Sequence, residues 1–151
     1  MRIFSAIFLI AVMLLPPSSR AQTSPLLGNW REPTGSVIHV EQCASGLCLR
    51  LVLLSPKAPA TVDVHNPDAA QRNRSLCDLV IGSRFQLNDA THASEGTLYD
   101  PKSGKTYRGT MTVMDNTLML RGYVGLPVFG KTESWQRVSG SVAPCRSSTT
   151  R

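Results

Sequence analysis

Two short stretches of the chain carry side chains whose types and spacing could do chemistry, and the first is GTLYDPKSGKTY. Its neighbours Tyr99 and Asp100 could act as a general acid and a general base. That role needs a pocket and a reacting partner, and the polar residues DPKSGK equally suit a turn between two strands. Asp100 and Pro101 are typical of the start of a turn, and Gly104 supplies the positive φ that tight hairpins often need. We interpret this stretch as a hairpin.

The second stretch is DVHNPD, in which Asp63, Asn66 and Asp68 offer oxygen atoms that could hold Ca²⁺. A calcium loop needs more carboxylates and a Gly at its sharp turn, and the stretch has neither. The alternative is a local role, with Asp63 in an ion pair with Arg72 or Arg74. We favour the local role and predict no bound metal.

The same stretch lies in a polar segment from Pro56 to Cys77 that contains few apolar residues. Asn66 can cap a helix whose first position is Pro67, with Asp68 near the positive end of the helix dipole. The sequence therefore predicts a long loop that carries one short helix.

The rest of the chain offers no recognisable catalytic pattern. His39, His65 and His92 are far apart in sequence, and no Ser stands in a nucleophile elbow. The zinc-protease pattern HExxH and a Gly-rich phosphate loop are also missing. Because residues distant in sequence can meet in a fold, a hydrolase or isomerase stays open as a third class of function. No cofactor is predicted.

The elements that must position these residues are strands, because apolar and polar residues alternate with a period of two along most of the chain. Short turn signals such as EPTG, ASG and DN separate several of them. An all-β, eight-stranded up-and-down antiparallel barrel fits this pattern, and a β-sandwich is the alternative. The predicted strands are GNWRE, SVIHVEQC, LCLRLVLL, LVIGSRFQ, EGTLY, TYRGTMTV, TLMLRGYV and KTESWQRV.

The alternation also predicts what the barrel contains, since about eight strands enclose an interior that side chains fill or that holds one small ligand. Gly109 and Gly122 have inward parity and add no side chain, which leaves room for a narrow apolar lumen. Val37 and Tyr123 are predicted to face outward. The inward set is Ile38, Val40, Leu49, Leu51, Leu53, Ile81, Phe85, Leu98, Met111, Val113, Leu118 and Leu120. The candidate ligand-binding residues are Leu51, Phe85, Tyr107, Met111 and Leu120.

The chain opens with MRIFSAIFLIAVMLLPPSSRAQTSP, which is typical of a secretory signal peptide. Arg2 is a short basic start, and residues 3–15 form an apolar run shorter than a membrane-spanning helix needs. Cleavage is expected after Ala21, which leaves residues 22–151 as one barrel domain. No later segment is long and apolar enough to span a membrane, so we expect a periplasmic or secreted protein.

The charge of the chain is positive but dispersed. Sixteen Lys and Arg stand against ten Asp and Glu, a formal net charge of +6, and loss of the two Arg in the predicted signal peptide leaves about +4. The basic residues are scattered singly, with few aromatic residues between them, so nucleic acid is not an expected partner. Such a surface suits anionic components of the cell envelope.

All four cysteines follow the predicted cleavage site, and an even number in an exported domain indicates disulfides. CASGLC lacks the spacing of a zinc knuckle. Cys43 and Cys48 lie on neighbouring strands joined by a short turn and share the outward parity, so a bond across the hairpin is geometrically allowed. That pairing leaves Cys77 for Cys145.

Both ends of the barrel sequence resemble the calycin, or lipocalin-type, pattern. GNW begins the first predicted strand with Gly28 and Trp30, and WQR lies in the last one with Trp135 and Arg137. In calycins an Arg of the final strand covers the Trp of the first. The resemblance implies that the Arg137 guanidinium closes one end of the barrel over the Trp30 ring.

The chain also resembles, over nearly its whole length after residue 21, the bacterial family called domain of unknown function 2147. The motifs that carry the resemblance are GNW, QCASGLC, DVHNPD, RNRSLC, GTLYDPKSGKTY, LRGYVG and SWQRV, in this order. The resemblance implies an exported, lipocalin-like barrel without an assigned reaction. Leu49 and Asp78 depart from it, since the family often has Gly at both places. The family-motif residues are Asp63, Asn66, Pro67, Asp68, Tyr99, Asp100, Pro101, Gly104, Tyr107, Gly122, Tyr123 and Gly125.

Two classes of function follow from these observations. The first is a binding barrel whose lumen takes a small, slender apolar molecule such as an acyl chain, with Tyr107 as a polar handle and the segment from Asp63 to Arg74 as a lid at the mouth. The alternative is a cell-envelope interaction protein with a filled core and no ligand.

Overall fold

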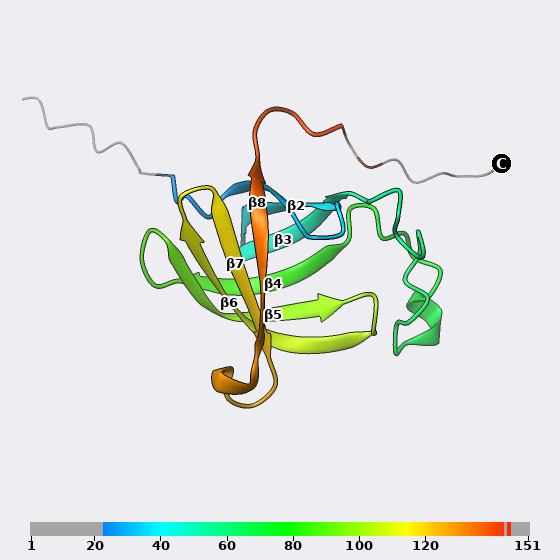
Figure 1. Cartoon of the computed structure of the whole chain (residues 1–151). Coiled ribbons are helices and arrows are strands. Elements are labelled where there is room, and N and C mark those ends of the chain that lie inside the picture. The colour runs from blue at the N-terminus through cyan, green and yellow to red at the C-terminus, as the bar shows by residue number, and fades with distance from the viewer. Residues whose placement is uncertain (1–22, 144, 146–151) are drawn as a thin grey trace, which may run out of the picture.

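The computed structural model describes residues 23–143 and 145, and in it eight antiparallel strands close into a barrel (Figure 1). Each strand pairs with the next, and β1 closes on β8, where Trp30 lies opposite Arg137. This order confirms the predicted up-and-down barrel and excludes the β-sandwich. The predicted signal peptide, residues 1–21, lies outside the described residues. The strands are β1 (Gly28–Arg31), β2 (Val37–Cys43), β3 (Gly46–Leu53), β4 (Val80–Leu87), β5 (His92–Asp100), β6 (Lys105–Met114), β7 (Thr117–Tyr123) and β8 (Lys131–Val138).

The strand boundaries follow the predicted alternation, with one larger difference at β5. This strand begins at His92, three residues before the predicted segment EGTLY. The Asp89 side chain accounts for the early start, because its Oδ1 accepts hydrogen bonds from the backbone amides of Thr91 (2.8 Å) and His92 (2.9 Å). The turn is therefore closed within a few residues, and the chain returns at once to the sheet.

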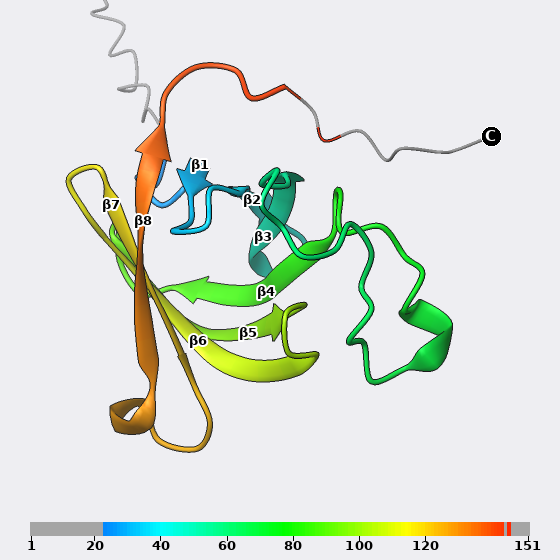
Figure 2. The ribbon, with the colours of Figure 1, turned by 45° about the vertical axis from the view of Figure 1, so that its right-hand side comes forward.

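The two ends of the barrel differ in what covers them. Because successive strands run in opposite directions, the β1–β2, β3–β4, β5–β6 and β7–β8 connections all lie at one end, which we call the loop end. The long β3–β4 connection stands beside the barrel in both views, and the β7–β8 connection projects below it (Figures 1 and 2). Residues 23–27 lie at the opposite, closed end, where Leu26 is fully buried.

The middle of the barrel is filled by large side chains that lie over glycines. A Cβ atom at Gly96 would overlap the Phe85 ring, and one at Gly109 would lie 2.7 Å from Leu98 Cδ1. At Gly82 a Cβ would lie 3.0 Å from Leu49. The glycines thus admit bulky neighbours, and the room beside Gly109 is occupied. Such small-to-large complementarity is how small barrels fill their interior.

Strand irregularities explain where the predicted inward and outward sets were wrong. Val37 was expected to face outward but is fully buried, because the register between β2 and β3 shifts at this point and breaks the alternation. Tyr123 keeps the predicted outward parity, opposite Arg108, but it is buried all the same, because the Arg108 guanidinium lies 5.9 Å from the centre of its ring and Gly130 packs beside it. Conversely, Leu53 and Ile81 are only partly buried.

The long β3–β4 connection contains one turn of 3₁₀ helix, η1 (Ala69–Gln71), where the sequence predicts a helix beginning at Pro67. Asp68 caps this turn by accepting a hydrogen bond from the Ala70 amide at 3.0 Å. The prediction of Asn66 as the helix cap is wrong, because the 3₁₀ turn begins only at Ala69; the Asn66 Oδ1 instead accepts a hydrogen bond from the Asp68 amide at 2.9 Å, just before the turn. A second 3₁₀ turn, η2 (Pro127–Phe129), lies in the β7–β8 connection and was not predicted.

Both predicted disulfides are present, and the described residues contain no free cysteine. Cys43 and Cys48 bridge the β2–β3 hairpin, and Cys77 and Cys145 join the start of β4 to the segment after β8. Disulfides are typical of proteins outside the reducing cytoplasm. Within residues 23–143 and 145 no helix is long and apolar enough to cross a membrane.

Candidate functional site

The closed end of the barrel is sealed by a stacked pair of side chains. The Arg137 guanidinium carbon lies 4.0 Å from the centre of the Trp30 ring, as the calycin resemblance implies. Arg137 also donates hydrogen bonds to the carbonyl oxygens of Leu27 (3.2 Å) and Pro25. The Trp30 indole nitrogen donates to the carbonyl oxygen of Leu26 at 2.9 Å. These contacts hold residues 25–27 across the closed end, so access to the interior must come from the other side.

Exposure of the inner face increases toward the loop end. Along β7, Leu118 is fully buried near the closed end, whereas Leu120 keeps 8 % of its surface exposed. Along β6, Met111 is 1 % exposed and the next large inward side chain, Tyr107, is partly exposed. Glu133, which pairs with Leu120 across β7 and β8, is also partly exposed. The more exposed inward side chains of these strands, Tyr107 and Glu133, therefore lie at the loop end.

The candidate ligand-binding residues fall into two groups according to their distance from the loop end. Phe85 and Met111 are packed in the filled middle, where they would form the floor of a shallow space. Leu51, Tyr107 and Leu120 lie nearer the loop end, where Tyr107 is partly exposed and the two leucines are buried apart from 5% and 8% of their surface.

Gly122 lies beside the inward residues near the loop end. A Cβ placed there would make ordinary contacts of 3.7 Å with Leu98 and Tyr107. Tyr107 makes no side-chain hydrogen bond within the described part of the chain, and its side chain is partly exposed. Its ring and hydroxyl are therefore available at the mouth.

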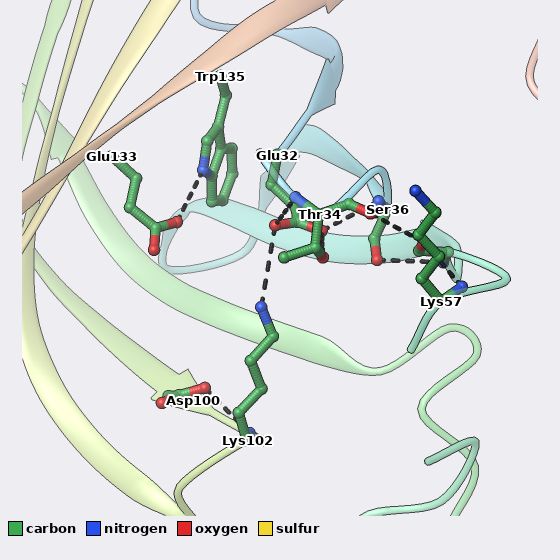
Figure 3. A network of polar contacts seen from close by, with 9 residues as sticks. Glu32, Thr34, Ser36, Lys57, Asp100, Lys102, Glu133 and Trp135 are labelled. Atoms are coloured by element: carbon green, nitrogen blue, oxygen red, sulfur yellow. Dashed lines mark hydrogen bonds and ion pairs between the residues drawn. The ribbon is translucent and has the colours of Figure 1, made fainter. Parts of the chain in front are cut away.

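A carboxylate network shapes the β1–β2 connection at the loop end (Figure 3). Glu32 directly follows β1, and its oxygens accept hydrogen bonds from the amide of Thr34 (2.9 Å), the hydroxyl of Thr34 and the amide of Ser36 (3.0 Å). Lys102 reaches from the β5–β6 hairpin to within 3.9 Å of Glu32. Burial alone would raise the pKa of Glu32, but the hydrogen bonds and the Lys102 charge hold it below its usual value.

Glu133 lies on the other side of this network. Its Oε2 accepts a hydrogen bond from the Trp135 indole nitrogen at 3.2 Å. In Figure 3 the side chains of Glu133 and Trp135 lie on one side of the view and those of Glu32 and Lys102 on the other. Among the described residues Glu133 forms no ion pair. The mouth thus combines apolar walls with one carboxylate that no cation neutralises.

The DVHNPD stretch forms a second polar network, which ties the long loop to β5. The buried Asp63 carboxylate accepts hydrogen bonds from the Tyr99 hydroxyl (2.6 Å), Asn66 Nδ2 (2.8 Å) and Arg74 Nε (2.9 Å). Arg74 completes an ion pair with Asp63 at 2.8 Å, and its guanidinium lies 5.5 Å from the Tyr99 ring centre. Of the two partners predicted for Asp63, Arg74 is therefore the one present. Arg72 donates instead to the carbonyl oxygen of Asn66.

The electrostatics of this network favour a structural role. Burial alone would raise the pKa of Asp63, but the hydrogen bonds and the Arg74 charge hold it below its ordinary value. Burial, the hydrogen bond to Asp63 and the Asp63 charge together raise the pKa of Tyr99 to about 12. Asp63 is thus a carboxylate with satisfied oxygens, and Tyr99 holds its proton firmly at neutral pH. Neither group is poised for proton transfer near pH 7.

The Tyr99 and Asp100 pair considered from the sequence does not come together as an acid and a base. Asp100 Oδ1 accepts a hydrogen bond from the Lys102 amide (3.0 Å), and its Oδ2 accepts one from the Ser103 hydroxyl (2.6 Å). Tyr99 points to the other network, and its partner across the hairpin is Thr106. Asp100 therefore builds the turn, as the hairpin interpretation predicts.

Gly104 allows the β5–β6 hairpin to pack closely against the long β3–β4 connection. Its φ of +69° is the positive value that the turn prediction requires. A Cβ atom at this position would overlap the carbonyl oxygen of His65. The hairpin and the DVHNPD segment are therefore in close backbone contact, which places most of the family-motif residues together at the loop end.

Two surface hollows lie outside the barrel interior. One, of about 210 Å³, lies between the outer faces of β1, β2 and β3 and the segment that ends at Cys145. The other, of about 490 Å³, lies at the closed end between residues 23–25 and 87–90. Neither is lined by a candidate ligand-binding residue. Within the described residues no group of three or more His, Cys, Asp or Glu side chains could hold a metal ion.

Sequence reasoning missed the polar residues of the mouth, Glu32, Lys102 and Glu133. They are separated by about seventy and thirty positions in the chain, and only barrel closure brings their elements together. One signal was available, because Glu133 shares the parity of Trp135 and Arg137 in the last strand. A carboxylate on the inward parity of a barrel strand is unusual enough to mark the site.

Comparison with protein families matches residues 28–137 to the family described as "Uncharacterized protein conserved in bacteria (DUF2147)". Among solved structures, the chain is similar to protein HP1028 from the human pathogen Helicobacter pylori, which is described as belonging to the lipocalin family. The two chains are 23% identical, and the match covers 78% of this chain and 85% of that chain with a TM-score of 0.70. This likeness shows a common fold. No curated protein matches the chain.

Proposed function

The chain belongs to the bacterial DUF2147 family, and on that premise we propose that it is an exported barrel that binds a small, mostly apolar molecule at its loop end. The disulfides support a location outside the cytoplasm. The sequence of residues 1–21 supports export through a cleaved signal peptide, with residues 22–151 as the single barrel domain of the mature protein. In a bacterium this export leads to the periplasm or the medium.

The observation that carries the proposal is the exposure gradient of the inner face. The closed end is sealed by Trp30 and Arg137, and the middle is filled by Phe85. The inward residues at the loop end remain partly accessible in an otherwise apolar wall. Small-molecule sites are typically concave and apolar with a few placed polar groups, and they favour the mouths of β-barrels.

The shape and lining of the mouth indicate the ligand class. Leu51 and Leu120 suit a short or slender apolar group, since the filled middle limits its depth. Tyr107 can donate a hydrogen bond, and Glu133 can accept one from a hydroxyl, amide or amine on the outer end of the ligand. A bulky charged cofactor does not suit this space.

The second candidate is an envelope interaction protein whose barrel is only a scaffold. The packing of Phe85 and Leu98 over Gly96 and Gly109 favours it, because a filled middle leaves no deep lumen. The two candidates differ in one respect that can be measured, which is saturable binding of an apolar molecule at the mouth.

The test is a titration of the exported protein with fatty acids of increasing length and with an environment-sensitive apolar dye. Leu51→Trp adds bulk at the mouth, and Val80→Trp adds the same bulk on the outer face of β4 as a control. We expect one saturable site in the wild type and in Val80→Trp, and at least tenfold weaker binding in Leu51→Trp. Circular dichroism checks that both variants fold. Absence of saturable binding in the wild type would move the assignment to the interaction protein.

A further inference from the structure

The β7–β8 connection presents a cluster of apolar side chains to solvent. Val124, Leu126, Val128 and Phe129 are 71%, 63%, 72% and 80% exposed. They lie within six consecutive exposed residues that project beyond the barrel at the bottom of Figure 2. Single exposed apolar residues are ordinary, but four in one projecting loop mark an interaction site. We call residues 124–129 the apolar loop.

The apolar loop is built to hold these side chains outward. Arg121 on β7 donates hydrogen bonds to the carbonyl oxygens of Pro127 (2.8 Å) and Val128 (3.3 Å) and to the Thr132 hydroxyl (2.8 Å). The Phe129 amide donates to the carbonyl oxygen of Leu126, and the turn of η2 follows. The carbonyl oxygens of Leu126, Pro127 and Val128 thus accept hydrogen bonds from the loop itself or from β7, and the apolar side chains point into solvent.

The surroundings of the apolar loop are basic. Between Asp115 and Glu133 the sequence has no acidic residue. Arg108 and Lys131 are exposed on β6 and β8 and pair with Tyr123 and Gly122 at the base of the loop. The full chain carries a formal net charge of +6, of which about +4 stays after loss of the two Arg of the predicted signal peptide.

The nearest carboxylates at this end are engaged or turned away. Asp100 accepts hydrogen bonds within its own turn, Glu32 is paired with Lys102, and Glu133 lies on the inner face. An anionic surface that approaches the apolar loop therefore meets positive charge.

We propose that the apolar loop docks this protein on the surface of an anionic phospholipid bilayer. Apolar side chains with a basic surround can enter the boundary between headgroups and acyl chains, where a few residues suffice. A convex loop of six residues is too small for a stable contact with a protein, which buries about 800 Å² on each partner. Charge and size thus both favour a lipid surface over a protein partner or a second copy.

The experiment is co-sedimentation of the exported protein with vesicles of phosphatidylethanolamine and phosphatidylglycerol, and with neutral phosphatidylcholine vesicles. Intact mass first establishes where the purified chain begins. Leu126→Ser and Phe129→Ser remove apolar contact from the loop. Met114→Ser is the matched control, because Met114 is 61% exposed at the end of β6, beside the turn to β7 at the closed end. All three positions are exposed, so folding should be unaffected, and thermal unfolding checks this.

We expect the wild type and Met114→Ser to sediment with the anionic vesicles and to bind the neutral ones several-fold more weakly. Each loop variant should lower the partition coefficient about tenfold, and Lys131→Ala should lower it about fivefold. The proposal is overturned if the wild type does not bind anionic vesicles, or if the loop variants and Met114→Ser behave alike. It is also overturned if the loop variants abolish self-association in sedimentation velocity while vesicle binding is absent.

Discussion

Asp63 belongs to a sequence motif of the family, and its role in the structure is to hold the fold together rather than to transfer a proton. A buried carboxylate is costly unless several donors surround it, and here the donors come from the long loop and from β5. The DVHNPD and GTLY motifs are far apart in sequence, yet both contribute to this one network. Their shared role is to fix the β3–β4 connection to the barrel wall, which leaves the segment from Asp63 to Arg74 held rather than free as a lid.

Tyr99→Phe should destabilise the protein by about 1.5–3 kcal/mol, the usual effect of removing a hydrogen bond to a charged group. The Tyr99 hydroxyl donates to Asp63 and accepts a weaker bond from Asn66 at 3.3 Å. Tyr107→Phe is the matched control, and its effect should stay within about 0.5 kcal/mol because its hydroxyl has no partner among the described residues. Urea unfolding at pH 7 measures both. Equal effects would contradict a special role for Tyr99.

The same network predicts how stability depends on acid. Because the pKa of Asp63 is lowered in the folded state, its stabilising effect is present above its unfolded pKa of about 3.9 and is lost as the pH falls through the folded value. Glu32 and Asp89 also have lowered pKa values, that of Asp89 at about 2, so the wild type should lose stability below about pH 5.

Asp63→Asn isolates the contribution of Asp63 to this acid dependence. The variant should be less stable at pH 7, and its loss of stability in acid should be shallower by up to about 1.4 kcal/mol per pH unit, the effect of one proton. Denaturant unfolding between pH 7 and pH 2 measures the slope. Parallel curves for the wild type and the variant would show that Asp63 takes up no extra proton on unfolding.

Two departures from the family pattern have a physical explanation in the structure. Asp78, where the family often has Gly, adopts a φ of +62°, which Gly reaches freely and Asp tolerates better than most residues. Leu49, the other departure, packs on Gly82. The sequence identifies both positions as departures from the family pattern. It could not show that Asp78 adopts a positive φ and that Leu49 packs against Gly82.

At the scale of elements, the alternation of apolar and polar residues predicted all eight strands and their order. It could not predict where the alternation breaks, because register shifts and the positive φ values of Arg84 (62°) and Glu95 (59°) depend on the neighbouring strand. Val37 was misplaced for a related reason, and the burial of the outward Tyr123 depends on Arg108 of the neighbouring strand. The polar residues of the mouth were missed because they meet only when β1, β8 and the β5–β6 hairpin are assembled.

The contact between the β5–β6 hairpin and the long loop gives a prediction with a close internal control. Gly104 and Gly125 have the same φ of +69°. A Cβ at Gly104 would overlap the His65 carbonyl oxygen, whereas one at Gly125 would meet no atom within 4 Å. Gly125→Ala should therefore cost about 1 kcal/mol from the backbone alone, and Gly104→Ala should cost about 1–3 kcal/mol more.

Chemical denaturation compares the two alanine variants, and limited proteolysis reports whether the long loop has come away from the hairpin. Faster cleavage within residues 54–79 is expected for Gly104→Ala only. Equal stability losses in the two variants would mean that the hairpin and the long loop are not in tight contact.

At the scale of the whole molecule, the proposed ligand site and the proposed membrane contact both lie at the loop end of the barrel. The closed end carries the Trp30 and Arg137 seal, whereas the loop end carries both the partly open mouth and the apolar loop. A barrel docked through residues 124–129 would therefore hold its mouth close to the lipid surface. An apolar ligand could then pass between bilayer and barrel with little exposure to water, which suits the ligand class proposed for the mouth.

The two disulfides constrain the barrel on very different length scales. Cys43 and Cys48 are five residues apart, so their bond closes a short hairpin, whereas Cys77 and Cys145 are 68 residues apart and enclose β4 to β8. Cys145 is also held by its amide, which donates to the carbonyl oxygen of Val52 at 2.9 Å. The long-range bond thus anchors the segment after β8 across the outer faces of β1, β2 and β3.

Replacing each pair of cysteines by serine should therefore have unequal effects. Loss of the long-range bond should lower the free energy of unfolding by about 4 kcal/mol, and loss of the hairpin bond by about 2 kcal/mol, since the entropy of the unfolded chain grows with the length of the loop that is released. Urea unfolding of the two double variants and the wild type measures this order. The reverse order would contradict the entropic account, as is expected if the unfolded chain stays compact between residues 77 and 145 and the longer loop is therefore the less effective constraint.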